Sequence, residues 1–157
     1  MNIQKTIFII GLVGMFGLYS CDNNRVFEEN QAINKKEWKY DEAKTFTIEI
    51  KDTTSLYTMF VNIRHNGNYR YSNLFILLGS KDPSGVTGKQ LLEFKLAEEN
   101  GKWLGKGIGD IFSYQIPIKK ELKIGKPGKY EFTLSQEMRD NPLLYMEDIG
   151  IRIEKAN

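Results

Sequence analysis

Apolar side chains recur at every second position through most of the chain after residue 38. Phe46, Ile48 and Ile50 alternate with Thr47 and Glu49, and this period is typical of a β-strand that buries one of its two faces. The same alternation, or a short apolar run, predicts further strands at residues 57–63, 74–78, 92–96, 112–118, 130–134 and 149–153.

Two of these predicted strands are more apolar than a half-buried strand requires. Residues 57–63 carry apolar side chains on most of both faces, which predicts a central strand. The run from Leu74 to Leu78 is continuously apolar, and such a run is typical of a strand covered on both sides. We therefore expect both segments in the interior of the fold.

Turn residues separate the predicted strands. Asn, Gly and Pro at residues 65–68, 81–85 and 126–129 favour tight turns because they adopt or fix the required backbone angles. One short helix is expected near residues 135–140, where Ser135 could cap the first turn and Pro142 discourages continuation.

About eight short strands with almost no helix predict an all-β fold. Each alternating strand must bury one face, so we expect a two-sheet antiparallel β-sandwich over residues 37–157. Eight strands favour a jelly-roll-like arrangement. An immunoglobulin-like sandwich is the alternative, although the Cys–Trp–Cys pattern of that fold is absent from the sequence.

The N-terminal segment predicts export and lipid attachment. Lys5 is followed by an apolar run from Ile7 to Tyr19, which is shorter than the roughly 20 residues a spanning helix needs. Leu18 and Ser20 then stand at the aliphatic and small positions of a lipobox before Cys21. We expect residues 1–20 to be a lipoprotein signal peptide and Cys21 to be the lipidated residue. The polar residues 21–36 are expected to form a lipidated tether.

Composition excludes several classes of function. The chain has one cysteine, so no intramolecular disulfide or thiolate metal cluster can form. A net charge of +2, with acids and bases interspersed, is far from the basic patch that nucleic-acid binding requires. We expect no metal, cofactor or catalytic residue, and no small-molecule ligand. The single histidine, His65, is expected to be a solvated turn residue.

Two short segments are candidates for binding. Gly105, Gly107 and Gly109 recur at every second position beside Trp103 and end at Asp110. Glycines in this pattern would lie on one face of an extended segment, where they admit either an aromatic ring or a docking partner. Without a strand–helix unit around them, they do not form a dinucleotide fingerprint.

Tyr69, Tyr71 and Asn73 form the second candidate, a stripe that precedes the apolar run at 74–78. Exposed tyrosines on a sheet could stack a sugar or fill a pocket on a partner protein. They could equally cover the edge of the sheet. The sequence leaves these interpretations open.

Several ordered motifs cover most of the chain after residue 20: residues 21–27 (CDNNRVF), 52–54 (DTT), 60–64 (FVNIR), 71–75 (YSNLF), 101–105 (GKWLG), 107–110 (GIGD), Gln136 with Met138 and Arg139, and 150–155 (GIRIEK). Together these motifs resemble the GldH family of gliding-motility lipoproteins of Bacteroidota.

The resemblance implies a non-enzymatic accessory of the gliding and associated secretion machinery that acts through protein contacts. It also implies anchoring in the cell envelope, which we expect to be at the outer membrane, facing the periplasm. A carbohydrate-binding envelope lipoprotein is the alternative, because a β-sandwich with Tyr69, Tyr71 and Trp103 could hold a glycan.

Overall fold

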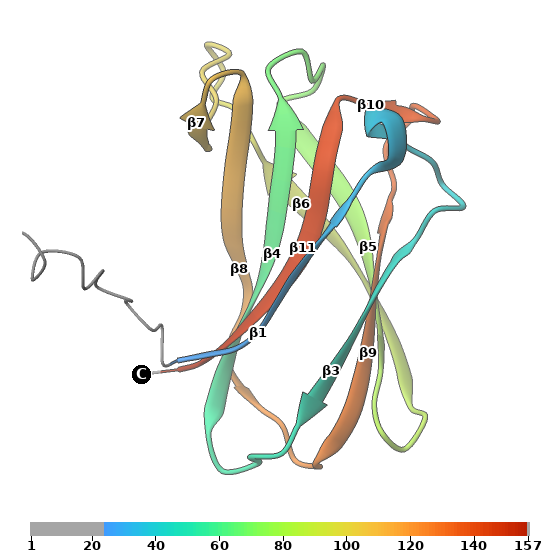
Figure 1. The fold of residues 1–157 in the computed structure, drawn as a ribbon, viewed down its shortest axis with the longest axis vertical. Helices are drawn as coiled ribbons and strands as arrows, with labels where there is room; N and C mark the ends of the chain where they lie inside the picture. The colour runs from blue at the N-terminus through green and yellow to red at the C-terminus, as the bar shows by residue number, and fades with distance from the viewer. Residues whose placement is uncertain (1–23, 157) are drawn as a thin grey trace, which may run out of the picture.

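The computed structural model describes residues 24–156, which form an antiparallel β-sandwich (Figure 1). One sheet has the strand order β1-β11-β4-β8-β7 and the other β3-β9-β5-β6, while β10 and β2 pair separately. A 3-10 turn, η2, spans Asn34–Lys36. The strands are β1 (Arg25–Ala32), β2 (Glu37–Trp38), β3 (Lys44–Ile50), β4 (Leu56–Asn66), β5 (Asn73–Lys81), β6 (Thr87–Lys95), β7 (Lys106–Ile108), β8 (Ile111–Lys123), β9 (Gly128–Gln136), β10 (Leu143–Leu144) and β11 (Met146–Lys155).

The eight longer strands pair as a nested set. β1 pairs with β11, β3 with β9, β4 with β8 and β5 with β6, so the outermost strands in the sequence are partners and the innermost form a hairpin. The pairings of β11 with β4 and of β9 with β5 then close the two sheets. This is the topology of a jelly roll, which confirms the predicted arrangement over the immunoglobulin-like alternative.

All seven strands expected from the alternating pattern are present. β4 lies in the middle of the five-stranded sheet, as its apolar faces predicted. β5 sends Leu74, Ile76 and Leu78 into the core. Its opposite face, with Phe75 and Leu77, is only half-buried, so the prediction that this strand is covered on both sides is met in part.

The helix expected near residues 135–140 does not form, because β9 runs to Gln136 and is followed by bends. The Gln136 side chain accepts a hydrogen bond from the Met138 backbone and donates one to the Asp140 carbonyl. The Glu137 backbone N–H donates to the Phe75 carbonyl on β5. These bonds to the sheet and within the loop replace those of a helix of one or two turns.

The segment expected to be a tether instead contributes a strand. Arg25–Ala32 forms β1 and pairs along its length with β11, which brings the sandwich to within four residues of Cys21. β1 is polar because it is an edge strand with only one neighbour, and its outward side chains meet charged partners. Cys21 itself lies outside the described residues.

An ion-pair network joins β1 to the sheet. The buried Arg152 guanidinium on β11 lies 2.6 Å from the Glu28 carboxylate on β1 and also contacts Glu154. Asn62 on β4 donates to both Glu28 and Asn30 at 3.0 Å. Burial opposes ionisation of Glu28, but the hydrogen bonds from Arg152 and Asn62 hold its pKa below the ordinary value.

We expect Gly150→Ala to weaken the attachment of β1. A Cβ at this position would lie 1.9 Å from Asn30 Oδ1 and 2.5 Å from the Glu29 carbonyl oxygen, so the β1 backbone must move. The free energy of unfolding, measured by urea denaturation, should fall by about 1–3 kcal/mol. Gly125→Ala is the control, since nothing lies within 4 Å of its Cβ position. Equal stabilities of the two variants would contradict the packing argument.

Candidate functional site

The two candidate segments meet at one end of the sandwich, which we call the loop end. The Gly67 backbone N–H donates to the Asp110 carbonyl at 2.7 Å, which ties the β4–β5 loop to the β7–β8 turn. Ala97 and Trp103 form an isolated antiparallel bridge. The tertiary structure therefore brings together residues that the sequence presented as two separate stripes.

His65 lies at the centre of an aromatic cluster at the loop end. Its ring centroid is 4.4 Å from that of Trp103, 5.0 Å from Tyr69, 5.5 Å from Tyr114 and 5.8 Å from Phe112. The expectation of a solvated turn residue is wrong, because His65 is 0% exposed. β4 continues through Asn66, and the alternation of the strand turns His65 inward, on the same face as Ile63.

Burial favours the neutral form of the His65 ring. It lowers the pKa of the imidazole, although a backbone hydrogen bond with Asn66 opposes the shift. In the neutral ring, Nδ1–H donates to the Asn66 carbonyl at 2.8 Å. Nε2 lies 3.1 Å from the Tyr114 hydroxyl, which is also 2.8 Å from the Leu96 carbonyl. The ring therefore links β4, β8 and the segment after β6.

The glycines admit aromatic rings, which is one of the two roles expected for them. A Cβ on Gly105 would lie 2.6 Å from the Tyr114 ring, and one on Gly107 would lie 3.2 Å from Phe112. Gly109 has a φ of +63° in the turn between β7 and β8. Gly105 and Gly107 are thus positions where the backbone approaches the cluster closely.

The tyrosine stripe does not form an exposed platform. Tyr69 is buried, its ring contacts Tyr71 at 5.8 Å, and its hydroxyl donates to the Asn73 carbonyl. Both tyrosines precede β5, so of the three candidates Asn73 alone lies on the strand, where its side chain donates to Glu93. Trp103 is half-buried against His65. The rings mainly cover the end of the sandwich.

Two apolar side chains at the loop end face solvent instead. Leu104 is 48% exposed and Ile108 is 83% exposed. Ile108 lies on β7, the short edge strand of the five-stranded sheet, directly before the turn at Gly109. Sequence reasoning emphasised the glycines and the tryptophan of this segment. The sequence feature that could have indicated Leu104 and Ile108 is the placement of these apolar residues among Gly and Lys in a short hairpin.

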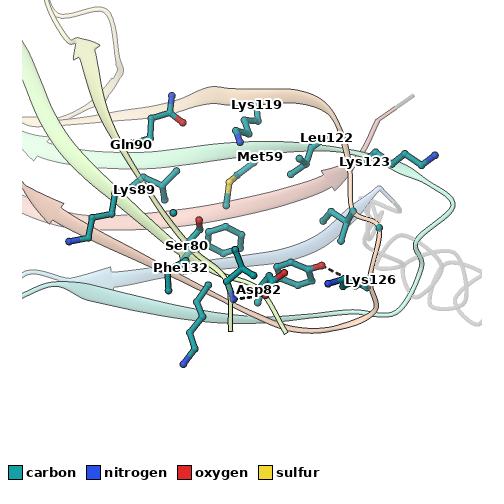
Figure 2. Close-up of a pocket in the computed structure, with 18 residues that line it drawn as sticks. Met59, Ser80, Asp82, Lys89, Gln90, Lys119, Leu122, Lys123, Lys126 and Phe132 are labelled. Atoms are coloured by element: carbon teal, nitrogen blue, oxygen red, sulfur yellow. Dashed lines mark hydrogen bonds between the residues drawn. The ribbon is translucent and has the colours of Figure 1, made fainter. Parts of the chain in front are cut away.

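A groove of about 550 Å³ opens at the opposite end of the sandwich (Figure 2). Apolar residues of β4, β5, β8, β9 and the β8–β9 connection line it: Met59, Leu78, Leu122, Ile124 and Phe132. Five lysines also line it: Lys81, Lys89, Lys119, Lys123 and Lys126. Sequence reasoning missed this groove, because its residues come from segments far apart in the chain.

Neither a metal site nor a spanning helix occurs in the part of the chain that the structure describes. Between residues 24 and 156, no three His, Cys, Asp or Glu side chains are grouped so that they could hold a metal ion. Within the same range, none of the helical segments is long and apolar enough to cross a bilayer.

These features define the class of protein, a small jelly-roll domain with an apolar loop end and a basic groove. The family model described as GldH lipoprotein matches residues 25–153, and the chain belongs to this family. The matched region begins at β1, so it includes the strand that completes the jelly roll.

Two relatives cover nearly the whole chain. The gliding motility lipoprotein GldH homolog of Christiangramia forsetii is 38% identical over 145 residues, which are 88% of this chain and 88% of the relative. The gliding motility lipoprotein GldH of Flavobacterium johnsoniae is 34% identical over 147 residues, 89% of this chain and 91% of the relative.

Solved structures resemble the sandwich only loosely. A family GH115 4-O-methyl-alpha-glucuronidase aligns with a TM-score of 0.44 at 16% identity, over 87% of this chain and 18% of that enzyme. A carbohydrate-binding module specific for non-crystalline cellulose aligns with a TM-score of 0.43 at 9% identity, over 82% of this chain and 70% of the module.

The stability of the protein should depend on pH through His65. Burial lowers its pKa from the ordinary 6.5, so just below pH 6.5 the unfolded chain binds a proton that the folded chain does not. The free energy of unfolding should therefore fall as the pH drops below 6.5. Urea denaturation should show that His65→Gln loses this part of the pH dependence. Because the chain has one histidine, NMR can follow its titration directly; a midpoint at or above 6.5 would contradict burial.

Gly105→Ala should disturb the aromatic cluster more than Gly107→Ala. The new Cβ at 105 would meet the Tyr114 ring at 2.6 Å and the Ser113 carbonyl oxygen at 2.9 Å, whereas at 107 the nearest atom is at 3.2 Å. We expect Gly105→Ala to lower the free energy of unfolding by about 1–3 kcal/mol and to change tryptophan fluorescence through Trp103. A larger fall in the free energy of unfolding for Gly107→Ala than for Gly105→Ala would contradict this packing of the aromatic rings.

Proposed function

We propose that this protein is a membrane-anchored, non-enzymatic assembly component of the gliding-motility and associated secretion machinery. It is held by lipid on Cys21 and acts through contacts with other proteins of that machinery. Membership of the GldH lipoprotein family and the names of both relatives support this role. The observation that carries the contact mechanism is the pair of exposed apolar residues, Leu104 and Ile108, on the loop end.

The position of the start of β1 supports a domain held close to its anchor. The Asn24 carbonyl accepts a hydrogen bond from the Lys155 backbone at 2.8 Å, so the chain is attached to the sandwich from residue 24 onward. Asn24 is three positions after Cys21 in the sequence, which is a reach of about 10 Å at most. A lipid on Cys21 would therefore hold the domain directly beside the bilayer. Acyl chains contribute about 0.8 kcal/mol for each buried CH₂, which favours stable attachment.

The loop end lies away from this attachment point. Lys155 pairs with Tyr57 near the start of β4, whereas His65 lies near its end. His65 is eight positions after Tyr57, which corresponds to about 27 Å of strand. Leu104 and Ile108 are thus on the part of the domain that faces away from the anchor. We place the protein at the outer membrane with this end in the periplasm.

The alternative role in carbohydrate binding depends on exposed rings at Tyr69, Tyr71 and Trp103. Tyr69 is buried and Trp103 packs on His65, so these side chains do not present a shared flat face for stacking a sugar. The apolar loop end therefore favours a protein partner.

The double variant Leu104→Asp/Ile108→Asp should lose its partners without losing its fold. A charged residue at the centre of a protein contact opposes its desolvation. We therefore expect the amount of machinery protein that is crosslinked to the variant and recovered from membranes to be roughly tenfold or more below the amount recovered with the unaltered protein. Mass spectrometry would identify the captured proteins. Both side chains are exposed, so the melting temperature should be unchanged.

Leu91→Asp is the matched control. Leu91 is an exposed apolar residue on β6, in the other sheet, and its replacement should leave capture intact. The proposal fails if the unaltered protein captures no envelope-machinery protein after crosslinking, or if the control loses capture as fully as the double variant.

A further inference from the structure

The groove opposite the loop end combines an apolar interior with a basic rim. Met59, Leu122 and Phe132 line it from β4, β8 and β9, and Lys123 extends outward beside them (Figure 2). Lysines 81, 89, 119, 123 and 126 contribute five positive charges to its lining. A ligand that complements both parts has an apolar chain and an anionic group.

The charge of the rim is not neutralised by neighbouring side chains. Ion pairs among the described residues involve other cations, such as Lys155 with Asp52 and Lys36 with Glu147, and none of the five groove lysines. Asp82 is the sole carboxylate that lines the groove. Its Oδ1 accepts hydrogen bonds from the backbone of Ser84 and Val86, which directs it into its own turn.

The groove lies on the same end of the sandwich as the attachment point. Lys155 on β11 pairs with Tyr57 on β4, which pairs with Leu122 on β8 in the groove wall. Arg25 on β1 pairs with Glu154, the neighbour of Lys155. Adjacent strands are about 4.8 Å apart, so three spacings place the start of β1 about 14 Å from the groove wall.

An exposed apolar side chain accompanies the lysines. Val86, in the turn between β5 and β6, is 65% exposed and also lines the groove. Lys126 reaches this turn, where its ammonium group donates to the Ser84 hydroxyl at 2.8 Å. An apolar side chain flanked by lysines is the composition of a surface that enters the boundary between lipid head groups and acyl chains.

We propose that this groove binds an anionic phospholipid of the bilayer that holds the anchor. The lysine rim binds the lipid phosphate, and an acyl chain lies against Met59, Leu122 and Phe132. Val86 enters the membrane surface beside it. This inference rests on the proposed function, because lipid on Cys21 is what brings the groove to the bilayer. It assigns the two ends of the sandwich different partners: lipid at the groove and protein at the loop end.

Tryptophan quenching by brominated phospholipids tests the proposal, because bromine quenches a ring only on contact with the lipid chains. Full-length protein purified from membranes would be reconstituted in vesicles of phosphatidylcholine with and without brominated phosphatidylglycerol. We expect Val86→Trp to be strongly quenched in the anionic vesicles. Ile108→Trp, at the loop end, should keep its emission. The native Trp38 and Trp103 give the same background in both variants.

Charge reversal distinguishes lipid binding by the groove lysines from a general effect of the net charge of the protein. In the Val86→Trp protein, Lys119→Glu/Lys123→Glu/Lys126→Glu should reduce quenching to the level of Ile108→Trp, since each lysine near an anionic surface strengthens binding about fivefold. The matched control, Lys39→Glu/Lys102→Glu/Lys106→Glu, makes the same change in net charge on exposed lysines outside the groove and should retain the quenching.

Three results would overturn the proposal: equal quenching at positions 86 and 108, quenching that does not depend on anionic lipid, or equal loss with both sets of lysine substitutions. Mass spectrometry of the same samples reports whether Cys21 carries lipid. An unmodified Cys21 would show failure of the anchor, whereas any of the three results with a lipidated protein would show failure of the groove.

Discussion

The pairing of the first strand with the last is the constraint on which this structure depends. β1 and β11 are joined along seven residue pairs, and the Arg152 guanidinium binds the Glu28 carboxylate across 124 residues of sequence. Without β1 the guanidinium would keep Glu154 on its own strand but lose the Glu28 carboxylate, so β1 supplies one of the two carboxylates that compensate its burial. The same pairing places Ile149, Ile151 and Ile153 of β11 in the core between two neighbouring strands.

This pairing also determines how the domain is oriented. Because β1 begins beside the end of β11, the segment that leads to Cys21 leaves from one end of the sandwich. The 11 residues of β4 then separate that end from His65 and the loops around it. A lipid anchor on Cys21 would give the two ends different surroundings. The groove lysines would face phosphate groups, while Leu104 and Ile108 would be free to meet protein partners. The surface chemistry of each end matches the surroundings that such an anchor would give it.

The aromatic cluster shows why the loop end holds a defined shape. The His65 ring contacts side chains from the β4–β5 loop, from the segment after β6 and from β8. Its Nδ1–H donates to the Asn66 carbonyl, and Nε2 lies 3.1 Å from the Tyr114 hydroxyl. Gly105 lets the Tyr114 ring lie against the backbone. Loops fixed in this way can hold Leu104 and Ile108 in place for a partner, which reduces the entropy lost on binding.

The sequence by itself determined seven of the strands, the all-β class and the family, because alternation over five to seven residues and ordered local motifs are properties of neighbouring residues. It indicated Tyr69, Trp103 and Gly105 as candidates for binding, but it placed them in two separate segments. Pairing across the chain decided the rest. β1 looks like a polar tether because its partners, such as Arg152, are more than a hundred residues away. The prediction of a helix near residues 135–140 was wrong, because Gln136 forms hydrogen bonds within the loop and the Glu137 backbone donates to β5. His65 is buried, and the lysines gather around one groove, because residues distant in sequence meet only when the two sheets close.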